Sequence, residues 1–476
     1  MKVTLIAPPW IFKEEVEFVS QNIGLGYLAS YLEMHDNEVV IIDSVAEGLD
    51  IRKPLYTKYA DVMRCGLSDE DIIKRIPKDS ELIGINAPFT DSRFIVNPLS
   101  HAIKKAFPDS LVVMGGIYPS TLTEESARLS GADAVISGEG EIPLLEITKG
   151  KDLKTIKGVS FYNSDYKFVD NGKAEMIENI EEEIPMPSFD LRPMKKYINW
   201  SQRGNKLNRT LTVVSSRGCP FKCRFCSYYS ISTGWRAFSA RRICEEIQIA
   251  IDKFGIDHVE FEDDNLTFNK ERSMNIFDGI QNLKGKEGEK IIWSAPNGVM
   301  IHTLDKELIS KMKESGCELI YLPVESGDPK ILKRMRKGHW KTHLDKTLEV
   351  AGYCAEVGLE ACAFFMLGYP GEDRKSFETT LDFCRRLIDA GATAITPLVA
   401  TPYQNTELHL EAKENGWLVH EDMGNVLIYQ QYSHFLPEFV LLNTPECSQQ
   451  EAYERHQEMT EAFKTKHNLR REKAPI

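Results

Sequence analysis

The second half of the chain alternates short apolar runs with longer stretches of helical periodicity, and few folds accommodate that pattern. Six runs rich in β-branched and aromatic residues begin at residues 211, 258, 291, 318, 358 and 392, so successive starts lie 27–47 residues apart. Segments such as ERSMNIFDGIQNLK and KTHLDKTLEVAGYCAEVG, which have helical periodicity, separate the runs. Strands that alternate with helices at this spacing form βα units and a parallel sheet. Polar residues collect where the runs end, and βα enzymes place their chemistry at that edge of the sheet.

The first 150 residues show a shorter form of the same alternation. Apolar runs in MKVTLIAPPW, EVVIIDS, ELIGINAPFTDS, LVVMGGIYPS and ADAVISGEGE are separated by helical segments such as GLGYLASYLEMHD. This pattern predicts a doubly wound, Rossmann-like α/β domain whose ligand lies over the carboxyl ends of the strands. No G-x-G-x-x-G follows the first run and no G-x-x-x-x-G-K-[ST] occurs, which argues against a dinucleotide or nucleoside triphosphate.

Composition limits the remaining classes. A length of 476 residues predicts two or three domains, and a net charge of −13 argues against a nucleic-acid-binding surface spread over the protein. No apolar run approaches the length of a transmembrane helix, and the first residues do not resemble a signal peptide. Ten cysteines are too sparse for a disulfide scaffold. We therefore expect a cytoplasmic protein without a transmembrane segment.

Three cysteines lie within eight residues in GCPFKCRFC: Cys219, Cys223 and Cys226. A structural zinc site needs four ligands, usually in two pairs, and the next cysteine, Cys244, falls in a predicted helix. Ordinary ferredoxin clusters also use four cysteines. A four-iron cluster on three thiolates leaves one iron open to a ligand that is not protein. The spacing therefore predicts such a cluster, with a chance grouping of structural cysteines as the alternative.

With Phe225 before the last cysteine, this motif resembles the signature of the radical S-adenosylmethionine (SAM) enzymes. The resemblance implies a 4Fe–4S cluster whose open iron binds the amino and carboxylate groups of SAM. It also implies that one electron cleaves SAM and yields a 5′-deoxyadenosyl radical, which removes a hydrogen atom from the substrate. An electron donor such as flavodoxin or ferredoxin is then an expected partner. The six βα units would form the partial (β/α)6 barrel of that family.

The same resemblance implies which polar residues at the strand ends contact SAM. Three adjacent carboxylates end the second strand, where the family binds the methionyl amino group. Their alternative role is a solvated acidic turn or a helix cap. We assign no catalytic residue. The expected SAM-binding residues are Phe225, Glu262, Asp263, Asp264, Asn297, Glu325, Ser326 and Gly368.

An α/β domain with MGGIYPS and SGEGE loops before such a barrel resembles the cobalamin-binding class (class B) of radical SAM enzymes, over residues 1–405. The histidines before residue 150, His35 and His101, lack a D-x-H-x-x-G context. This matches a class in which no protein histidine ligates cobalt. The alternative is a vestigial domain with an empty pocket. The expected cobalamin-binding residues are Pro9, Gly24, Gly26, Thr90, Ser92, Gly115, Gly116, Pro119, Ser120, Gly138, Glu139, Gly140 and Glu141.

The expected domains are therefore a cobalamin-binding domain (1–150), a connector (151–205), the radical SAM barrel (206–405) and a helical C-terminal cap (406–476). We expect the cap to cover the barrel mouth and shield a radical from water, with simple packing as the alternative. Its apolar patch comprises Tyr429, Tyr432, Phe435, Phe439, Val440 and Leu441.

The preferred hypothesis is a cobalamin-dependent radical SAM methyltransferase. It would methylate an unactivated carbon of a small molecule, using methylcobalamin and a 5′-deoxyadenosyl radical. A first alternative keeps both cofactors but catalyses a cyclisation, ring contraction or rearrangement without methyl transfer. A second alternative is a non-catalytic redox or corrinoid-binding protein. The sequence leaves lipid, tetrapyrrole, peptide and antibiotic precursors open as substrates.

Overall fold

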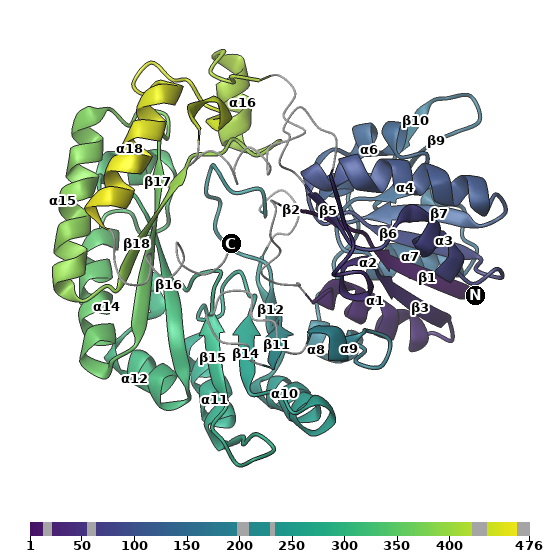
Figure 1. The fold of residues 1–476 in the computed structure, drawn as a ribbon, viewed down its shortest axis with the longest axis horizontal. Helices are drawn as coiled ribbons and strands as arrows, with labels where there is room; N and C mark the ends of the chain where they lie inside the picture. The colour runs from purple at the N-terminus through teal and green to yellow at the C-terminus, as the bar shows by residue number, and fades with distance from the viewer. Residues whose placement is uncertain (13–20, 55–62, 198–208, 229–233, 421–435, 464–476) are drawn as a thin grey trace. The chain divides into compact units, whose positions relative to one another are not determined.

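The computed structural model describes residues 1–12, 21–54, 63–197, 209–228, 234–420 and 436–463. The chain divides into two compact units, one formed mainly by residues 1–202 and the other mainly by residues 203–475. Each unit is built around its own β-sheet (Figure 1). No helix among the described residues is long and apolar enough to cross a membrane.

A seven-stranded sheet forms the centre of the N-terminal unit, in the order β10-β9-β8-β7-β6-β1-β3. The chain runs from β1 to β3 on one side and then to β6 on the other, so the topological switch point lies between β1 and β6. This arrangement confirms the predicted doubly wound domain. Its parallel strands are β1 (Lys2–Ala7), β3 (Glu38–Asp43), β6 (Leu82–Asn86), β7 (Leu111–Gly115) and β8 (Ala134–Ile136).

Helices pack in two groups around this sheet: α1 contacts α7, whereas α4 contacts α3 and α6. Helices on both faces explain why β1 and β6 are almost entirely buried and read as near-continuous apolar runs. The helices are α1 (Ile23–Glu33), α3 (Asp69–Arg75), α4 (Arg93–Ala106), α6 (Thr123–Leu129) and α7 (Glu141–Thr148).

Residues that the sequence suggested as a connector add to the N-terminal unit. Strands β9 (Val159–Tyr162) and β10 (Phe168–Asp170) extend its sheet in antiparallel fashion. The Tyr197 hydroxyl, at the end of α9 (Met194–Tyr197), donates a hydrogen bond to buried Asp43 at the end of β3. Burial raises the pKa of Asp43, while the hydrogen bond from Tyr197 opposes that rise. A separate antiparallel sheet, not foreseen from the sequence, contains β2 (Trp10–Phe12), β4 (Arg52–Pro54) and β5 (Met63–Cys65).

Six parallel strands form the second unit, and their spatial order, β11-β14-β15-β16-β17-β18, is also their chain order. All six predicted strands are present, which confirms the partial barrel. They are β11 (Thr210–Val213), β14 (His258–Phe261), β15 (Ile292–Ala295), β16 (Cys317–Glu325), β17 (Glu360–Leu367) and β18 (Ala394–Val399).

The helices between these strands begin and end at local signals. For example, the Ser239 side chain accepts a hydrogen bond from Arg242 N at the start of α10, and Gly255 ends that helix in a left-handed conformation. Asp373 caps α15 in the same way, by accepting from Ser376 N. The helices are α10 (Ala240–Phe254), α11 (Lys270–Asn282), α12 (Lys306–Glu314), α13 (Pro329–Arg334), α14 (His343–Val357) and α15 (Arg374–Ala390).

The described residues after β18 are largely helical. They include α16 (Glu407–Glu414) and α18 (Gln449–Ala462), and α18 packs against β18 and β17. Val440 and Leu441 of the apolar patch are buried. Tyr429, Tyr432 and Phe435 lie outside the described residues.

Candidate active site

The cysteine loop follows β11 and is held at both of its ends. Ser216 and Arg217 (β12) pair in antiparallel fashion with Arg236 and Ala237 (β13), so the strands flank the cysteine segment. Behind them, the fully buried Asp263 carboxylate accepts hydrogen bonds from Ser215 N at 2.9 Å, from Ser215 Oγ at 2.7 Å and from Ser216 Oγ. Asp263 therefore anchors the start of this loop.

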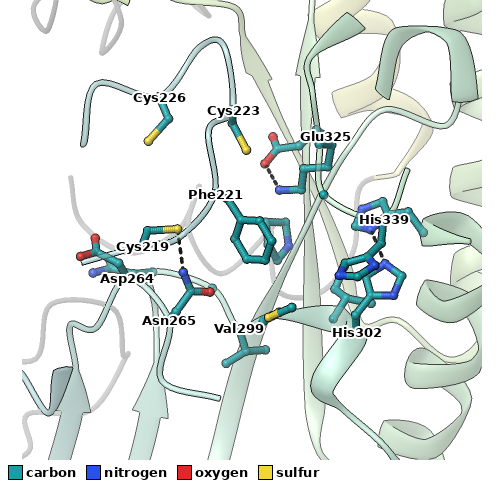
Figure 2. Close-up of a pocket in the computed structure, with 18 of the residues that line it drawn as sticks. Cys219, Phe221, Cys223, Cys226, Asp264, Asn265, Val299, His302, Glu325 and His339 are labelled. Carbon is teal, nitrogen blue, oxygen red and sulfur yellow. Dashed lines mark hydrogen bonds and ion pairs between the residues drawn. The ribbon is translucent and has the colours of Figure 1, made fainter. Parts of the chain in front are cut away.

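The three cysteines line a cavity of about 350 Å³ at the carboxyl ends of the barrel strands (Figure 2). Its wall combines the cysteine loop with residues that follow β14 and β15, the end of β16, and the segment before α14. The lining residues are Cys219, Phe221, Cys223, Phe225, Cys226, Tyr228, Asp264, Asn265, Asn297, Gly298, Val299, Met300, Ile301, His302, Pro323, Glu325, Lys337, Gly338, His339 and His343.

The thiols suit a cluster better than a single metal ion. Among the described residues, no group of three or more His, Cys, Asp or Glu side chains is placed to hold one ion. A zinc ion would draw its sulfur ligands to about 2.3 Å from one centre. The next cysteine along the chain, Cys244, does not line the cavity. Its Sγ packs against Gly279 of α11, so closely that a Cβ added to this glycine would lie 2.1 Å from the sulfur. Three separated thiols on one cavity therefore fit a 4Fe–4S cluster with an open corner.

Burial changes the acidity of two of these thiols. Burial raises the pKa of Cys219 and of Cys223, so without a metal both groups favour the protonated form. Asn265 Nδ2 donates a hydrogen bond to Cys219 Sγ at 2.8 Å, and Cys226 N donates to Cys223 O at 3.1 Å. Asn265, which the sequence analysis missed, thus orients the first cysteine.

A buried ion pair lies next to the cysteines. Lys337 Nζ donates to Glu325 Oε1 at 2.9 Å, and the two side chains are only 14% and 11% exposed. Burial alone would lower the pKa of Lys337, but the charges of Glu325 and Cys223 raise it above its ordinary value. Glu325 has φ = +73°, an unfavourable conformation for a residue with a side chain, so surrounding structure holds it there. Such outliers concentrate at functional sites.

Three histidines gather on the same cavity: His302 from the segment after β15, His339 from just before α14, and His343 from the start of α14. The ring centres of His302 and His339 are 4.4 Å apart, and those of His302 and His343 are 5.6 Å apart. His343 Nε2 lies 3.2 Å from Val324 O, so this nitrogen donates and leaves Nδ1 to face His302 Nε2 at 3.4 Å. Burial lowers the pKa of His302 to about 4 and that of His343 to about 3, so both rings are neutral near pH 7.

Of the expected SAM-binding residues, Phe225, Asp264, Asn297 and Glu325 line the cavity. Burial raises the pKa of Asp264 to about 6. Asn297 Nδ2 donates to Glu262 Oε2 at 2.7 Å, so Glu262 stands behind Asn297.

The other three expected residues have neighbours outside that lining. Asp263 bonds to the serines described above. The Ser326 hydroxyl accepts from Asp328 N at 3.1 Å. A Cβ added to Gly368 would lie 2.9 Å from Ala452 Cβ, so this glycine leaves room for α18. The SAM-binding roles of these residues stay predictions.

Apart from the three cysteines, the other lining residues were not among the expected SAM-binding residues: Phe221 lies within the cysteine motif itself, whereas most of the rest belong to no local motif. These other lining residues are Phe221, Tyr228, Asn265, Gly298, Val299, Met300, Ile301, His302, Pro323, Lys337, Gly338, His339 and His343.

In the N-terminal unit, glycines shape the carboxyl edge of the sheet. Gly116, after β7, has φ = +114°, and a Cβ there would lie 2.5 Å from Ala87 O. Gly138, after β8, has φ = +101°. Ser120 joins the two loops, since its hydroxyl donates to Gly116 O at 2.7 Å and accepts from Gly138 N at 2.9 Å. Both glycines are therefore required by the packing of their own loops, since a Cβ at Gly116 would meet Ala87 and a Cβ at Gly138 would lie 3.2 Å from Ala174 Cβ.

The remaining expected cobalamin-binding residues follow the same strand ends or begin helices beside them. Pro9 follows β1, and Thr90 and Ser92 form a 3₁₀ turn after β6. Gly24 and Gly26 lie near the start of α1, where Gly26 faces the Arg192 side chain, and Glu141 begins α7. These residues meet at one edge of one sheet, and their contacts with a corrinoid stay predictions.

The two histidines of this unit lie elsewhere. His35 Nδ1 lies 2.8 Å from Tyr31 O beyond the end of α1, and His101 Nε2 lies 3.1 Å from Leu129 O on α4. Neither follows the carboxyl end of a strand. Neither histidine is therefore placed at the carboxyl edge of the sheet, and a cobalt without a histidine ligand stays a prediction.

Two family models match the chain. The model described as "Radical SAM superfamily" matches residues 213–384, and the one described as "B12 binding domain" matches residues 9–148. The chain is 33% identical over 428 residues to the "Uncharacterized methyltransferase PH0819" of Pyrococcus horikoshii, which covers 88% of this chain and 84% of that protein. It is 24% identical to the cytidylyl-2-hydroxyethylphosphonate methyltransferase of Streptomyces wedmorensis, over 90% of this chain and 85% of that protein.

Another relative is named as a cyclase and not as a methyltransferase. The anaerobic magnesium-protoporphyrin IX monomethyl ester cyclase of Cereibacter sphaeroides is 22% identical, over 81% of this chain and 61% of that protein.

Two solved structures share the fold. The cobalamin-dependent SAM radical enzyme OxsB has a TM-score of 0.69 at 18% identity, and the match covers 89% of this chain but 63% of OxsB. The methyltransferase TsrM from Kitasatospora setae has a TM-score of 0.65 at 17% identity, over 87% of this chain and 76% of that chain.

Proposed function

Given that this chain belongs to the cobalamin-binding radical SAM enzymes, we propose that it is a C-methyltransferase that methylates an unactivated carbon of a small molecule. The observation that carries the proposal is the cavity itself, on which three cysteines without a fourth meet a buried lysine and several polar strand ends. A reaction at an open cluster corner needs this combination of metal ligands and groups that hold a charged cosubstrate.

The 4Fe–4S cluster supplies the electron that cleaves SAM, and cobalamin supplies a carrier for the methyl group. Cys219, Cys223 and Cys226 would hold the cluster, with Asn265 orienting Cys219. The Asp264 carboxylate suits the amino group of SAM, and the Lys337 ammonium suits its carboxylate.

Much of the rest of the wall is apolar. Its apolar members are Phe221, Phe225, Val299, Met300, Ile301 and Pro323. A radical that forms beside such a surface has few competing partners there, because apolar side chains offer no exchangeable protons.

Methyl transfer is favoured over the alternatives by two relatives with methyltransferase names, each of which matches more than four fifths of both chains. A cyclase that keeps both cofactors is the second candidate, supported by the cyclase relative.

An external donor such as flavodoxin or ferredoxin would supply the electron. We place the protein in the cytoplasm, because ten cysteines in 476 residues are too sparse for a disulfide scaffold.

The test uses anaerobically reconstituted protein with dithionite, with and without cobalamin, and SAM that carries a labelled methyl group. We expect 5′-deoxyadenosine that depends on the three cysteines, and S-adenosylhomocysteine that depends on cobalamin. Deoxyadenosine without cobalamin-dependent S-adenosylhomocysteine would shift the assignment to a cyclase or rearrangement. Absence of both products would favour a non-catalytic corrinoid protein.

A further inference from the structure

A basic groove lies on the barrel unit, apart from the cavity described above. It encloses about 490 Å³ and is lined by Arg224, Lys330, Ile331, Lys333, Arg334, Arg336 and Gly371. Five of these seven residues are cations, in a chain whose net charge is −13. We propose that this groove binds a small acidic electron-transfer protein, which delivers to the cluster the electron that the proposed function requires.

The groove and the cluster share one short loop. Arg224 stands directly after Cys223 and two residues before Cys226, so one side of this loop carries cluster ligands and the other a groove residue. The backbone fixes Arg224 on both sides, since Arg224 N donates to Met335 O at 3.1 Å and Leu408 N donates to Arg224 O at 2.9 Å. A donor seated in the groove would therefore contact the same short loop that carries the cluster ligands. Electron transfer between proteins depends steeply on the distance between donor and acceptor.

Two carboxylates organise the arginines without cancelling the charge. Glu407 pairs with Arg224 at 3.1 Å and with Arg336 at 2.6 Å, while Glu411 pairs with Arg334 at 2.7 Å. A third carboxylate, Glu446, accepts a hydrogen bond from Gly371 N at 3.3 Å, so five cations and three carboxylates leave an excess of two positive charges. Partly exposed ion pairs of this kind are worth about 1 kcal/mol or less, so carboxylates of a partner can compete for the arginines.

The two lysines of the groove face solvent. Both Lys330 and Lys333 are exposed, and no carboxylate among the described residues lies within ion-pair distance of either ammonium group. Lys333 Nζ is 5.6 Å from the centre of the Trp340 ring, and Lys341 Nζ is 5.7 Å from the same ring. The positive surface thus continues past the groove over an aromatic side chain.

These features suit a protein more than a small anion. An anion site in a folded protein is normally built from buried donors that converge on one point, whereas these lysines are exposed and spread along a helix. A broad patch of one charge instead raises the association rate of an oppositely charged partner, and salt weakens that effect. In the transfer itself the donor loses one electron and the cluster gains it, with no bond made or broken.

The experiment measures how fast the reconstituted cluster is reduced, from the loss of its visible absorbance in a stopped-flow instrument. Reduced flavodoxin and dithionite are compared as donors, at low and at high salt, in wild type and in Lys330→Glu/Lys333→Glu. A control, Lys284→Glu/Lys286→Glu, makes the same charge change in the loop between α11 and β15, at the opposite edge of the barrel.

We expect reduction by flavodoxin at low salt to be at least about 10-fold slower in the groove variant than in wild type or the control. The difference should shrink at high salt, and reduction by dithionite should be equal in all three proteins. Lys330→Gln/Lys333→Gln should fall between wild type and the charge reversal. Flavodoxin rates in the groove variant equal to those of wild type or of the control would overturn the docking proposal. Failure of the wild-type cluster to accept electrons from dithionite would instead count against the proposed function.

Discussion

Arg455 of helix α18 forms a buried ion pair with Glu372, which lies in the loop after β17. Arg455 Nη1 donates to Glu372 Oε1 at 3.2 Å and to Glu372 O at 2.8 Å, and the side chains are 3% and 0% exposed. The same carboxylate accepts from Gly368 N at 3.1 Å. The last described helix therefore holds in place the loop at the carboxyl end of the fifth barrel strand.

Replacing Arg455 with Met should destabilise the barrel unit by about 3–5 kcal/mol, because Glu372 would remain buried without its cation. Chemical denaturation followed by circular dichroism measures the loss. The double variant Glu372→Leu/Arg455→Met should recover a large part of it, since no buried charge remains. A double variant as unstable as the sum of the two single variants would show that the residues act independently.

The cluster should contain about four irons and four sulfides after anaerobic reconstitution. Replacing Cys219, Cys223 and Cys226 together with Ala should abolish it, whereas Cys244→Ala should leave it intact because Cys244 packs on α11. Iron and sulfide analysis, together with electron paramagnetic resonance of the reduced protein, measures both variants. A full cluster in the triple variant would mean that other ligands hold the iron.

Cobalamin should bind to the protein without a histidine ligand to cobalt. His35→Gln/His101→Gln should bind cobalamin as tightly as wild type, because both histidines are engaged with backbone carbonyls of helices or their connections. Electron paramagnetic resonance of the cob(II)alamin form should show no nitrogen splitting from an axial ligand. Such a splitting in wild type that the double variant loses would assign the ligand to one of these residues.

Lys337→Gln should weaken SAM binding by at least about 30-fold, because the change removes a cation from a buried pair and leaves Glu325 uncompensated. Calorimetric titration of the reconstituted protein with SAM gives the affinity. Lys346→Gln is the matched control, since Lys346 pairs with Glu349 and lies outside the cavity lining. Equal affinity in the two variants would remove Lys337 from the SAM site.

His258 should make stability depend on pH. Its ring lies between Thr210 Oγ1, 3.1 Å from Nδ1, and Ser294 Oγ, 3.3 Å from Nε2, and burial lowers its pKa to about 4. Between about pH 6.5 and pH 4 the unfolded chain binds a proton that the folded protein does not, so stability falls as pH falls. The full contribution of this group is about 3 kcal/mol, at about 1.4 kcal/mol for each unit of pKa. The free energy of unfolding of His258→Leu, measured across this range, should have a smaller slope than that of wild type.

Sequence reasoning succeeded where the signal is local. Strand β16 follows from ELIYLPVESG, an apolar run that ends in Gly. The three cysteines of one loop line a single cavity, and their role as cluster ligands stays a prediction. The three carboxylates after β14 are a more instructive case. Side chains alternate along extended backbone, so Asp263 points away from its neighbours and anchors Ser215, while Asp264 reaches the cavity.

The rest depends on long-range folding. His302 lies far along the chain from His339 and His343, which are only four residues apart, so only the barrel brings the ring of His302 to the other two. Lys337 lies in the basic stretch KRMRK, a pattern typical of a solvent-exposed surface. In the structure its side chain is largely buried and its ammonium group pairs with Glu325. Strand β4 is exposed along all three residues, so no apolar alternation reveals it.

The packing of α18 on β18 and β17 also sets an order of events during protein synthesis. The N-terminal unit is formed mainly by residues 1–202 and can fold while later residues are still being added by the ribosome. The barrel unit cannot, because residues 449–462, which cover its last strands, are translated after all six strands have been made. During that interval the surfaces of β17 and β18 that α18 later covers remain open to chaperones or to wrong partners. A pause in translation after β18 has emerged from the ribosome, but before residues 449–462 have followed it, would therefore leave these strand surfaces uncovered for longer.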